Sequence, residues 1–162
     1  MDNNYLNNKG DNSMVQTSDE IIKNTQDKVK TILNQKFQNH IEFDDGRFVI
    51  NRGSTQVMIL VRPFTETETC VECIANVVVG AEINNEISQF LLRKNAEIHF
   101  GAFGLLFDNT ITFSHTIAGK NLDENELLLT ANAVAVIADH YDDEIVAIAG
   151  GKRAVDALED EL

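Results

Sequence analysis

Two cysteines three residues apart, Cys70 and Cys73, have the spacing that carries redox or zinc chemistry in other proteins. Redox use favours a first cysteine at a helix N-terminus, where the thiolate is stabilised. Here the pair lies in a stretch of alternating apolar residues that is typical of a strand, and residues three apart in a strand point to opposite faces. A structural zinc site needs four ligands, and the sequence has no second pair of cysteines. We therefore predict two free thiols, one buried and one on the outer face of a sheet.

A second cluster, Asp139, His140, Asp142, Asp143 and Glu144, contains residue types that bind metal ions. His140 and Glu144 would lie one helical turn apart, as would Asp139 and Asp143, but the two pairs occupy neighbouring faces of a helix. No other segment offers a matching set of the oxygen ligands that a hard cation requires. We expect no metal site and no cofactor.

The glycine-rich segments do not match the motifs of enzymes. Gly101-Ala102-Phe103-Gly104 lacks the third glycine and the following helix of a dinucleotide-binding loop. Gly150-Gly151 follows a predicted helix, so it is interpreted as a helix end rather than a phosphate-binding loop. The sequence predicts a protein that is not an enzyme and has no catalytic residues.

The net charge of the 162-residue chain is −13. This charge argues against nucleic acid as a partner, because phosphates are neutralised by Lys and Arg, and equally against an anionic membrane surface. Residues 121–149 hold seven carboxylates and no Lys or Arg, which predicts a solvated acidic helix face that could also steer a basic partner. The sequence contains no apolar run of the ~18 residues of a membrane span and no signal-peptide pattern at its start, so we expect a cytoplasmic protein.

Composition divides the chain into three parts. Residues 1–16 are rich in Asn and have little to bury, which predicts a disordered tail. Residues 17–151 hold the periodic segments and are expected to form a single α+β domain. Residues 152–162 are expected to form an acidic C-terminal extension.

The first half of that domain predicts one helix followed by strands. Thr17 and Glu20 have the spacing of a capping box before an apolar stripe, which places a helix at about 18–38. Asp45-Gly46 is a strong hairpin signal between strands at 41–44 and 47–51. Strands are then expected at 55–61, ended by Pro63, and at 68–79.

The second half predicts a short helix, a hairpin and a long helix. Asn84 or Asn85 would cap the short helix, and strands at 96–107 and 110–117 would join across a turn at 108–109. Asn121 or Asp123 would cap the long helix. Short turns between strands indicate an antiparallel sheet of about five to six strands with three helices, in the order α-β(3-4)-α-β(2)-α, which is an α+β fold.

Several of these segments together resemble the bacterial YbjN family, which is similar in fold to type III secretion chaperones. The resemblance spans roughly 40–151 and implies a small acidic α+β protein that is often a dimer and binds peptide segments of other proteins. It implies no catalytic residues. The segments that carry it are Gly46-Arg47-Phe48-Val49, Arg52-Gly53-Ser54-Thr55, Leu92–Ile98, Phe100-Gly101-Ala102-Phe103, His115–Gly119 and Ala133–Asp139.

The outer face of the sheet is the predicted functional surface. If helices cover one face alone, apolar side chains of two neighbouring strands remain exposed, and such patches mark interfaces. We expect a protein or peptide client, or a second copy in a homodimer, to close this face; alternatively, the first and last helices cover opposite faces and no patch exists. A regulatory module is the second functional interpretation and an enzyme the third. The predicted interface residues are Met58, Leu60, Cys70, Ile74 and Val78.

Overall fold

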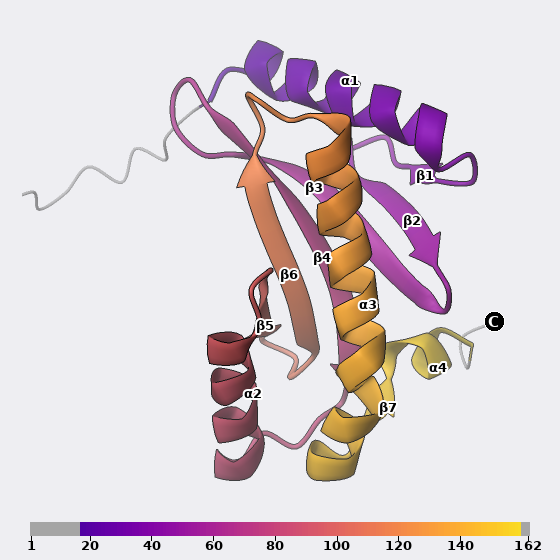
Figure 1. Cartoon of the computed structure of the whole chain (residues 1–162), viewed down its shortest axis with the longest axis vertical. Coiled ribbons are helices and arrows are strands. Elements are labelled where there is room, and N and C mark those ends of the chain that lie inside the picture. Colours follow the sequence, from indigo (N-terminus) through magenta and orange to yellow (C-terminus); the bar gives the residue numbers. More distant parts are fainter. Residues whose placement is uncertain (1–16, 160–162) are drawn as a thin grey trace, which may run out of the picture.

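The computed structural model describes residues 17–159, so the predicted tail at 1–16 lies outside the described residues. Within this range four helices and seven strands form an α+β fold, which confirms the predicted class (Figure 1). The helices are α1 (Asp19–Lys36), α2 (Asn85–Glu97), α3 (Glu124–Ala149) and α4 (Ala154–Glu159). The strands are β1 (Ile41–Glu42), β2 (Phe48–Arg52), β3 (Thr55–Pro63), β4 (Thr69–Val79), β5 (Ala102–Leu105), β6 (Ile111–Ala118) and β7 (Lys152–Arg153).

The strands form one antiparallel sheet in the order β1-β2-β3-β4-β6-β5. Strand β7 pairs with the last two residues of β4, Val78 and Val79. The short helix α4 follows β7 directly. The first residues of the segment that composition marks as an acidic extension therefore form part of the sheet and a short helix.

Helix α1 begins one residue later than the sequence pattern predicts. Ser18, and not Thr17, is the N-cap, and its Oγ accepts a hydrogen bond from Ile21 N–H. The predicted capping box with Thr17 is therefore wrong. The Thr17 hydroxyl is buried and donates to the backbone oxygen of Thr65 in the β3–β4 turn, because this tertiary contact competes with the local cap.

Helix α3 has the ends that its sequence predicts. Asp123 is the N-cap, its carboxylate accepts from Glu126 N–H, and the Glu126 side chain accepts from Asp123 N–H in return. Gly150 ends the helix with a φ of 65°, which an L side chain rarely adopts. The helix between these caps is long enough to cross the core face of the sheet (Figure 1).

The predicted strand at 96–107 is wrong over its first half. Helix α2 continues to Glu97, and β5 begins only at Ala102, after Gly101 turns the chain with a φ of 86°. The Asn95 side chain lies between the two elements and bonds to the backbone of Phe103. Helix propensity and this tertiary contact extend the helix over residues whose alternation alone favours a strand.

Candidate functional site

Helices α1 and α3 cover the same face of the sheet. Leu33 of α1 and Leu127 of α3 belong to one core together with Val57 of β3 and Val71 of β4. A salt bridge of 2.8 Å between Lys36 Nζ and Glu124 Oε1 joins the two helices. Figure 1 shows α3 in front of the sheet and α1 across its upper end, where the Thr25 and Thr69 hydroxyls are hydrogen-bonded at 2.7 Å. The alternative in which they cover opposite faces is therefore wrong, and neither helix covers the outer face.

A row of apolar side chains crosses this outer face. The strand register places Ile41 opposite Val49, Val49 opposite Met58, and Met58 opposite Ile74. Directly opposite residues have their side chains on the same face, so these four residues from β1 to β4 lie side by side. Met58 and Ile74 are half-buried, and Ile41 is 48% exposed. We name these four residues the apolar row; two of them, Met58 and Ile74, are predicted interface residues.

The sequence pattern does not single out Ile41 and Val49, the other half of the row. Both lie on the β1–β2 hairpin, and the alternation of that hairpin is too short to assign a face. The predicted two-residue turn at Asp45-Gly46 would have paired Ile41 with Ile50. Phe43 N–H donates to Arg47 O instead, so the loop is one residue longer and Ile41 lies opposite Val49.

Leu60 and Cys70 also lie on the outer face, beyond the row. Leu60 is 8% exposed, as is Val49 of the row, so each leaves little surface for a partner to contact. Cys70 is half-buried and lies opposite Arg62 of β3. Burial, and after it the Glu72 carboxylate, raises the pKa of the Cys70 thiol.

Cys73 lies on the other face of β4, opposite Ile59, and is fully buried. Burial raises the pKa of the Cys73 thiol to about 12. Both cysteines are free, as predicted, and both thiols hold their protons at neutral pH. Because the thiolate is the reactive and ligating form, the pair is unsuited to redox or metal chemistry.

Val78 occupies a different face from the one predicted. The ladder between β4 and β6 pairs Asn76 with Thr112 and then Val78 with Ile111, which leaves Val77 as an extra residue. A bulge of this kind reverses the alternation of the strand beyond it. Val78 therefore shares the core face with Ile111, and its side chain is fully buried. Of the five predicted interface residues, it is the one that the structure places in the core.

A hollow of about 550 Å³ opens beside the apolar row. Three residues of the row, Val49, Met58 and Ile74, form part of its lining. It lies where β3 separates from β4 and β7 takes the place beside β4, so the sheet has a gap there. The start of β3, the β5–β6 turn and α4 form its walls, and α3 contributes Ala138 and Asp142 from the core side.

The lining of the hollow is acidic. In the part of the chain that the structure describes, it contains two carboxylates, Asp108 and Asp142, and no Lys, Arg or His. Asp142 is 9% exposed, and burial raises the pKa of its carboxyl. Asp108 is exposed, and the hydrogen bond that it accepts from Thr110 N–H at 2.9 Å lowers its pKa.

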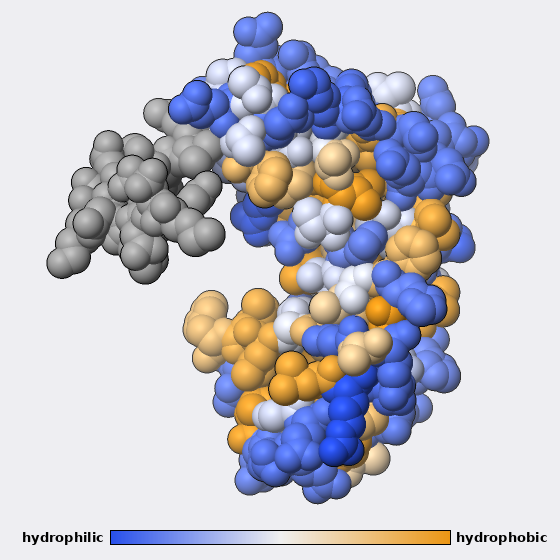
Figure 2. Space-filling model, turned by 60° about the vertical axis from the view of Figure 1, so that its left-hand side comes forward, coloured by the Kyte–Doolittle hydropathy of each residue, from blue (hydrophilic) through white to orange (hydrophobic). Residues whose placement is uncertain are grey.

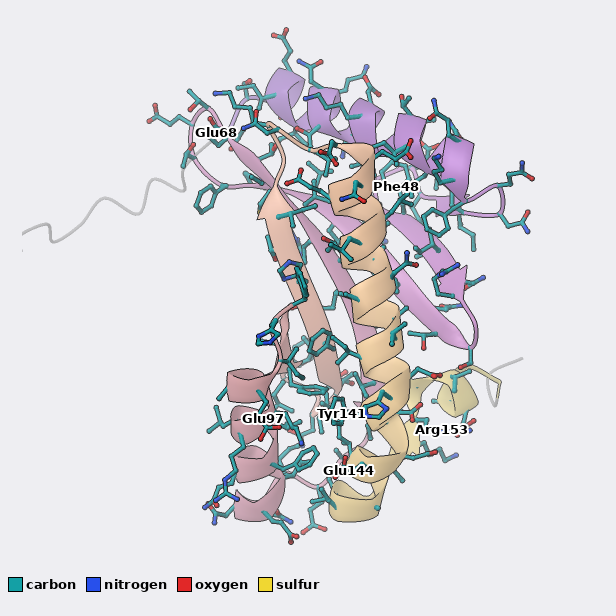
Figure 3. The ribbon with its side chains drawn as sticks, viewed as in Figure 1. Phe48, Glu68, Glu97, Tyr141, Glu144 and Arg153 are labelled. Atoms are coloured by element: carbon teal, nitrogen blue, oxygen red, sulfur yellow. The ribbon has the colours of Figure 1, made fainter. Side chains whose placement is uncertain are left out.

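Arg153, the cation whose charge acts on Asp142, has its own carboxylate partners. Its Nε and Nη2 donate to the two oxygens of Asp156 at 2.7 and 2.8 Å, and its Nη1 lies 3.7 Å from Asp143 Oδ1. Figure 3 shows Arg153 at the base of α3 beside α4, whereas Tyr141 lies on the side of α3 that faces α2. The bidentate pair with Asp156 holds α4 against β7, which fixes one wall of the hollow.

A further exposed apolar group lies at the end of β5. Leu105, Leu106 and Phe107 are 49%, 39% and 102% exposed, and no interface prediction includes them. In Figure 2, apolar side chains gather on the lower half of the molecule, next to α2 and β5, whereas the upper surface over α1 is mostly hydrophilic. The sequence contains a signal for this group, namely three consecutive apolar residues before the Asp108-Asn109 turn. Because alternate side chains of a strand point to opposite faces, such a run places apolar side chains on both faces of the sheet.

Neither a metal cluster nor a membrane-spanning helix occurs in the described range. Among residues 17–159 no group of three or more His, Cys, Asp and Glu side chains is placed to hold a metal ion. Over the same residues, no helix is long and apolar enough to cross a membrane.

Comparison with known proteins gives a family and a fold. Residues 23–157 match the family of type III secretion (YopN, CesT) and YbjN peptide-binding chaperones. A chain in the crystal structure of the ExsC–ExsE complex is similar in fold, with a TM-score of 0.57 and 15% identity over 79% of this chain and 97% of that one. No curated protein sequence matches significantly. The resemblance to YbjN in the sequence is thereby confirmed, and the chain belongs to this family of peptide-binding chaperones.

Proposed function

We propose that the chain binds an extended segment of a client protein along the apolar row and into the hollow beside it. The observation that carries this proposal is that α1 and α3 share one face of the sheet, so that Met58 and Ile74 remain partly exposed on the other. Burying such a patch is favourable by about 25 cal/mol per Å² of apolar surface. Membership of a peptide-binding family supports the proposal, and so does the similar fold of a chain from the ExsC–ExsE complex, which contains two different proteins.

The proposal does not involve catalysis. Burial raises the pKa of both thiols, so both hold their protons at neutral pH and neither offers a thiolate nucleophile. Free thiols are typical of a reducing compartment, which supports action in the cytoplasm. The exposed Leu105–Phe107 group supports a homodimer in which a second copy covers it.

The test uses a displayed library of 20-residue peptides and the full-length chain. Peptides that the chain enriches are labelled, and their Kd is measured by fluorescence anisotropy for wild type, Met58→Asp and Ile74→Asp. We expect each variant to weaken binding by at least about tenfold, because a buried carboxylate on the row has no partner. The matched control is Thr116→Asp, which places the same charge at an exposed position of the same face on β6.

The result has three readable outcomes. Loss of affinity in the two row variants and not in Thr116→Asp supports the proposal, provided that circular dichroism shows all three variants folded. Equal affinity for all four proteins would place peptide binding on another surface. Failure of the library to yield any binder would refute peptide binding by this chain.

A further inference from the structure

Asp142 stands in an unusual position for a carboxylate of an acidic helix. The neighbouring carboxylates of α3, Asp139, Asp143 and Glu144, are more exposed, whereas Asp142 is 9% exposed and lines the hollow. It reaches the hollow from the core side, through the gap between β3 and β7. A client segment on the apolar row would therefore have this carboxylate within the hollow beside it.

The Asp142 carboxylate can accept further hydrogen bonds. Within the described residues it accepts one hydrogen bond, from Asp143 N–H to Oδ1 at 2.6 Å, whereas two carboxylate oxygens offer about four acceptor positions. The Arg153 guanidinium, whose charge acts on Asp142, is held by both oxygens of Asp156. A buried carboxylate with one partner is costly, and a cation that donates hydrogen bonds to it offsets part of that cost.

The surroundings of Asp142 favour a cation over an anion. Asp108 lines the same hollow, and Asp139 lies at its edge, where its Oδ1 accepts a hydrogen bond from Ser54 Oγ at 3.0 Å. The net charge of −13 attracts positive groups at longer range. The rest of the lining is apolar or uncharged, which suits the aliphatic stem of Arg or Lys, and the volume of about 550 Å³ is ample for either side chain.

We propose that the hollow selects client segments in which an Arg or Lys side chain follows apolar residues, with the Asp142 carboxylate as its partner. This inference rests on the proposed function, because it names the residue type that the same surface selects. Arg is favoured over Lys, since its guanidinium can donate two parallel hydrogen bonds to one carboxylate. The apolar row binds the apolar residues of the client segment, and Asp142 selects, among segments of equal apolar content, those with a basic side chain.

The test compares two pools of 15-residue peptides that share the same apolar positions. One pool has Arg at the central position and the other has Gln. We expect the full-length wild type to bind the Arg pool at least about tenfold more tightly at low salt, and Asp142→Asn to bind both pools alike. The matched control is Glu144→Gln, which removes the same charge from an exposed position on α3 and keeps the preference for Arg.

Two outcomes separate this inference from the proposed function. If both pools bind wild type equally and Met58→Asp abolishes binding, the client surface stands and the selection by Asp142 is wrong. If Asp142→Asn retains the preference for Arg, the basic side chain binds elsewhere and the inference is likewise wrong.

A second measurement does not need a peptide. N-acetyl-arginine methylamide is titrated into isotope-labelled protein, with N-acetyl-glutamine methylamide as the uncharged probe, and amide NMR signals of Ala138 and Val155 in the lining are followed. Shifts with the arginine probe that vanish in Asp142→Asn support the inference. Absence of shifts at millimolar probe, or equal shifts with both probes, would overturn it.

Discussion

The Asn95 side chain pairs with both backbone groups of Phe103. Asn95 Oδ1 accepts from Phe103 N–H at 2.6 Å, and Asn95 Nδ2 donates to Phe103 O at 3.1 Å. Phe103 lies in the middle of β5, the last strand of the sheet order, so these groups would otherwise remain open at the sheet edge. The amide thus replaces the backbone of one further strand residue and blocks this edge against another chain.

Replacement of Asn95 by Ala should therefore weaken β5. We expect Asn95→Ala to lower the free energy of unfolding by about 1–2 kcal/mol, because two backbone groups lose their partner. Urea unfolding measures this change. Gln89→Ala, at an exposed position of the same helix, is the control and should change stability by less than about 0.5 kcal/mol. An Asn95→Ala variant as stable as that control would show that water replaces the amide without cost.

The bulge in β4 predicts unequal effects at two positions that simple alternation places on one face. Val78→Ala should cost about 2 kcal/mol of unfolding free energy, because Val78 is fully buried against Ile111. Ile74→Ala should cost less than about 1 kcal/mol, because Ile74 is partly exposed on the outer face. Urea unfolding of both variants checks the difference. Equal losses would place both side chains in comparable packing and contradict the assigned faces.

Burial of Asp142 predicts a dependence of stability on pH. Burial raises the pKa of its carboxyl above 3.8, and the carboxylates of Asp143 and Asp139 add to this, while the Asp143 N–H and Arg153 oppose it. Asp108, on the opposite wall, is a further carboxylate of the same hollow. The folded state therefore keeps the Asp142 proton over a pH range in which the unfolded chain has released it. The stability that this proton contributes is present at low pH and is lost as pH rises through the folded pKa.

The Asp142→Asn variant removes this dependence. Relative to wild type, the variant should gain stability as pH rises above about 4, because Asn has no carboxyl to ionise in the hollow. The Oδ1 of the introduced Asn can still accept the hydrogen bond from Asp143 N–H. Urea unfolding between about pH 3.5 and about pH 8 measures the difference between the two proteins, and a constant difference would mean that the Asp142 pKa is the same folded and unfolded.

The exposed end of β5 predicts self-association. Phe107→Asp should leave the unfolding free energy unchanged within about 0.5 kcal/mol, because the side chain is fully exposed, and should shift the protein towards the monomer. Sedimentation equilibrium measures the mass. Val136→Asp, which changes a 66% exposed apolar residue on α3, is the control. If wild type is itself a monomer at every accessible concentration, the homodimer is wrong.

Local chemistry determined much of this fold from the sequence alone. Contacts or φ values within a few residues account for the N-cap at Asp123, one of the two caps that the sequence offers, for the helix end at Gly150 and for the end of β3 at Pro63. The opposite faces of Cys70 and Cys73 follow from the period of a strand. Such features need no knowledge of the rest of the chain, so one sequence is enough to predict them.

Tertiary structure alone decided which surface is open and what lies beside it. Which face of the sheet α1 and α3 cover depends on how two amphipathic helices pack on a sheet whose outer face is also apolar. The bulge at Val77 depends on the pairing of β4 with β6. The Thr17 hydroxyl does not cap α1 as predicted but donates to the backbone oxygen of Thr65, 48 residues along the chain. From the sequence alone, Asp142 is predicted to lie on a solvated acidic helix face. In the structure it is a buried carboxylate that lines the hollow, because the sheet has a gap between β3 and β7. Each of these depends on contacts between distant segments, which local periodicity does not contain.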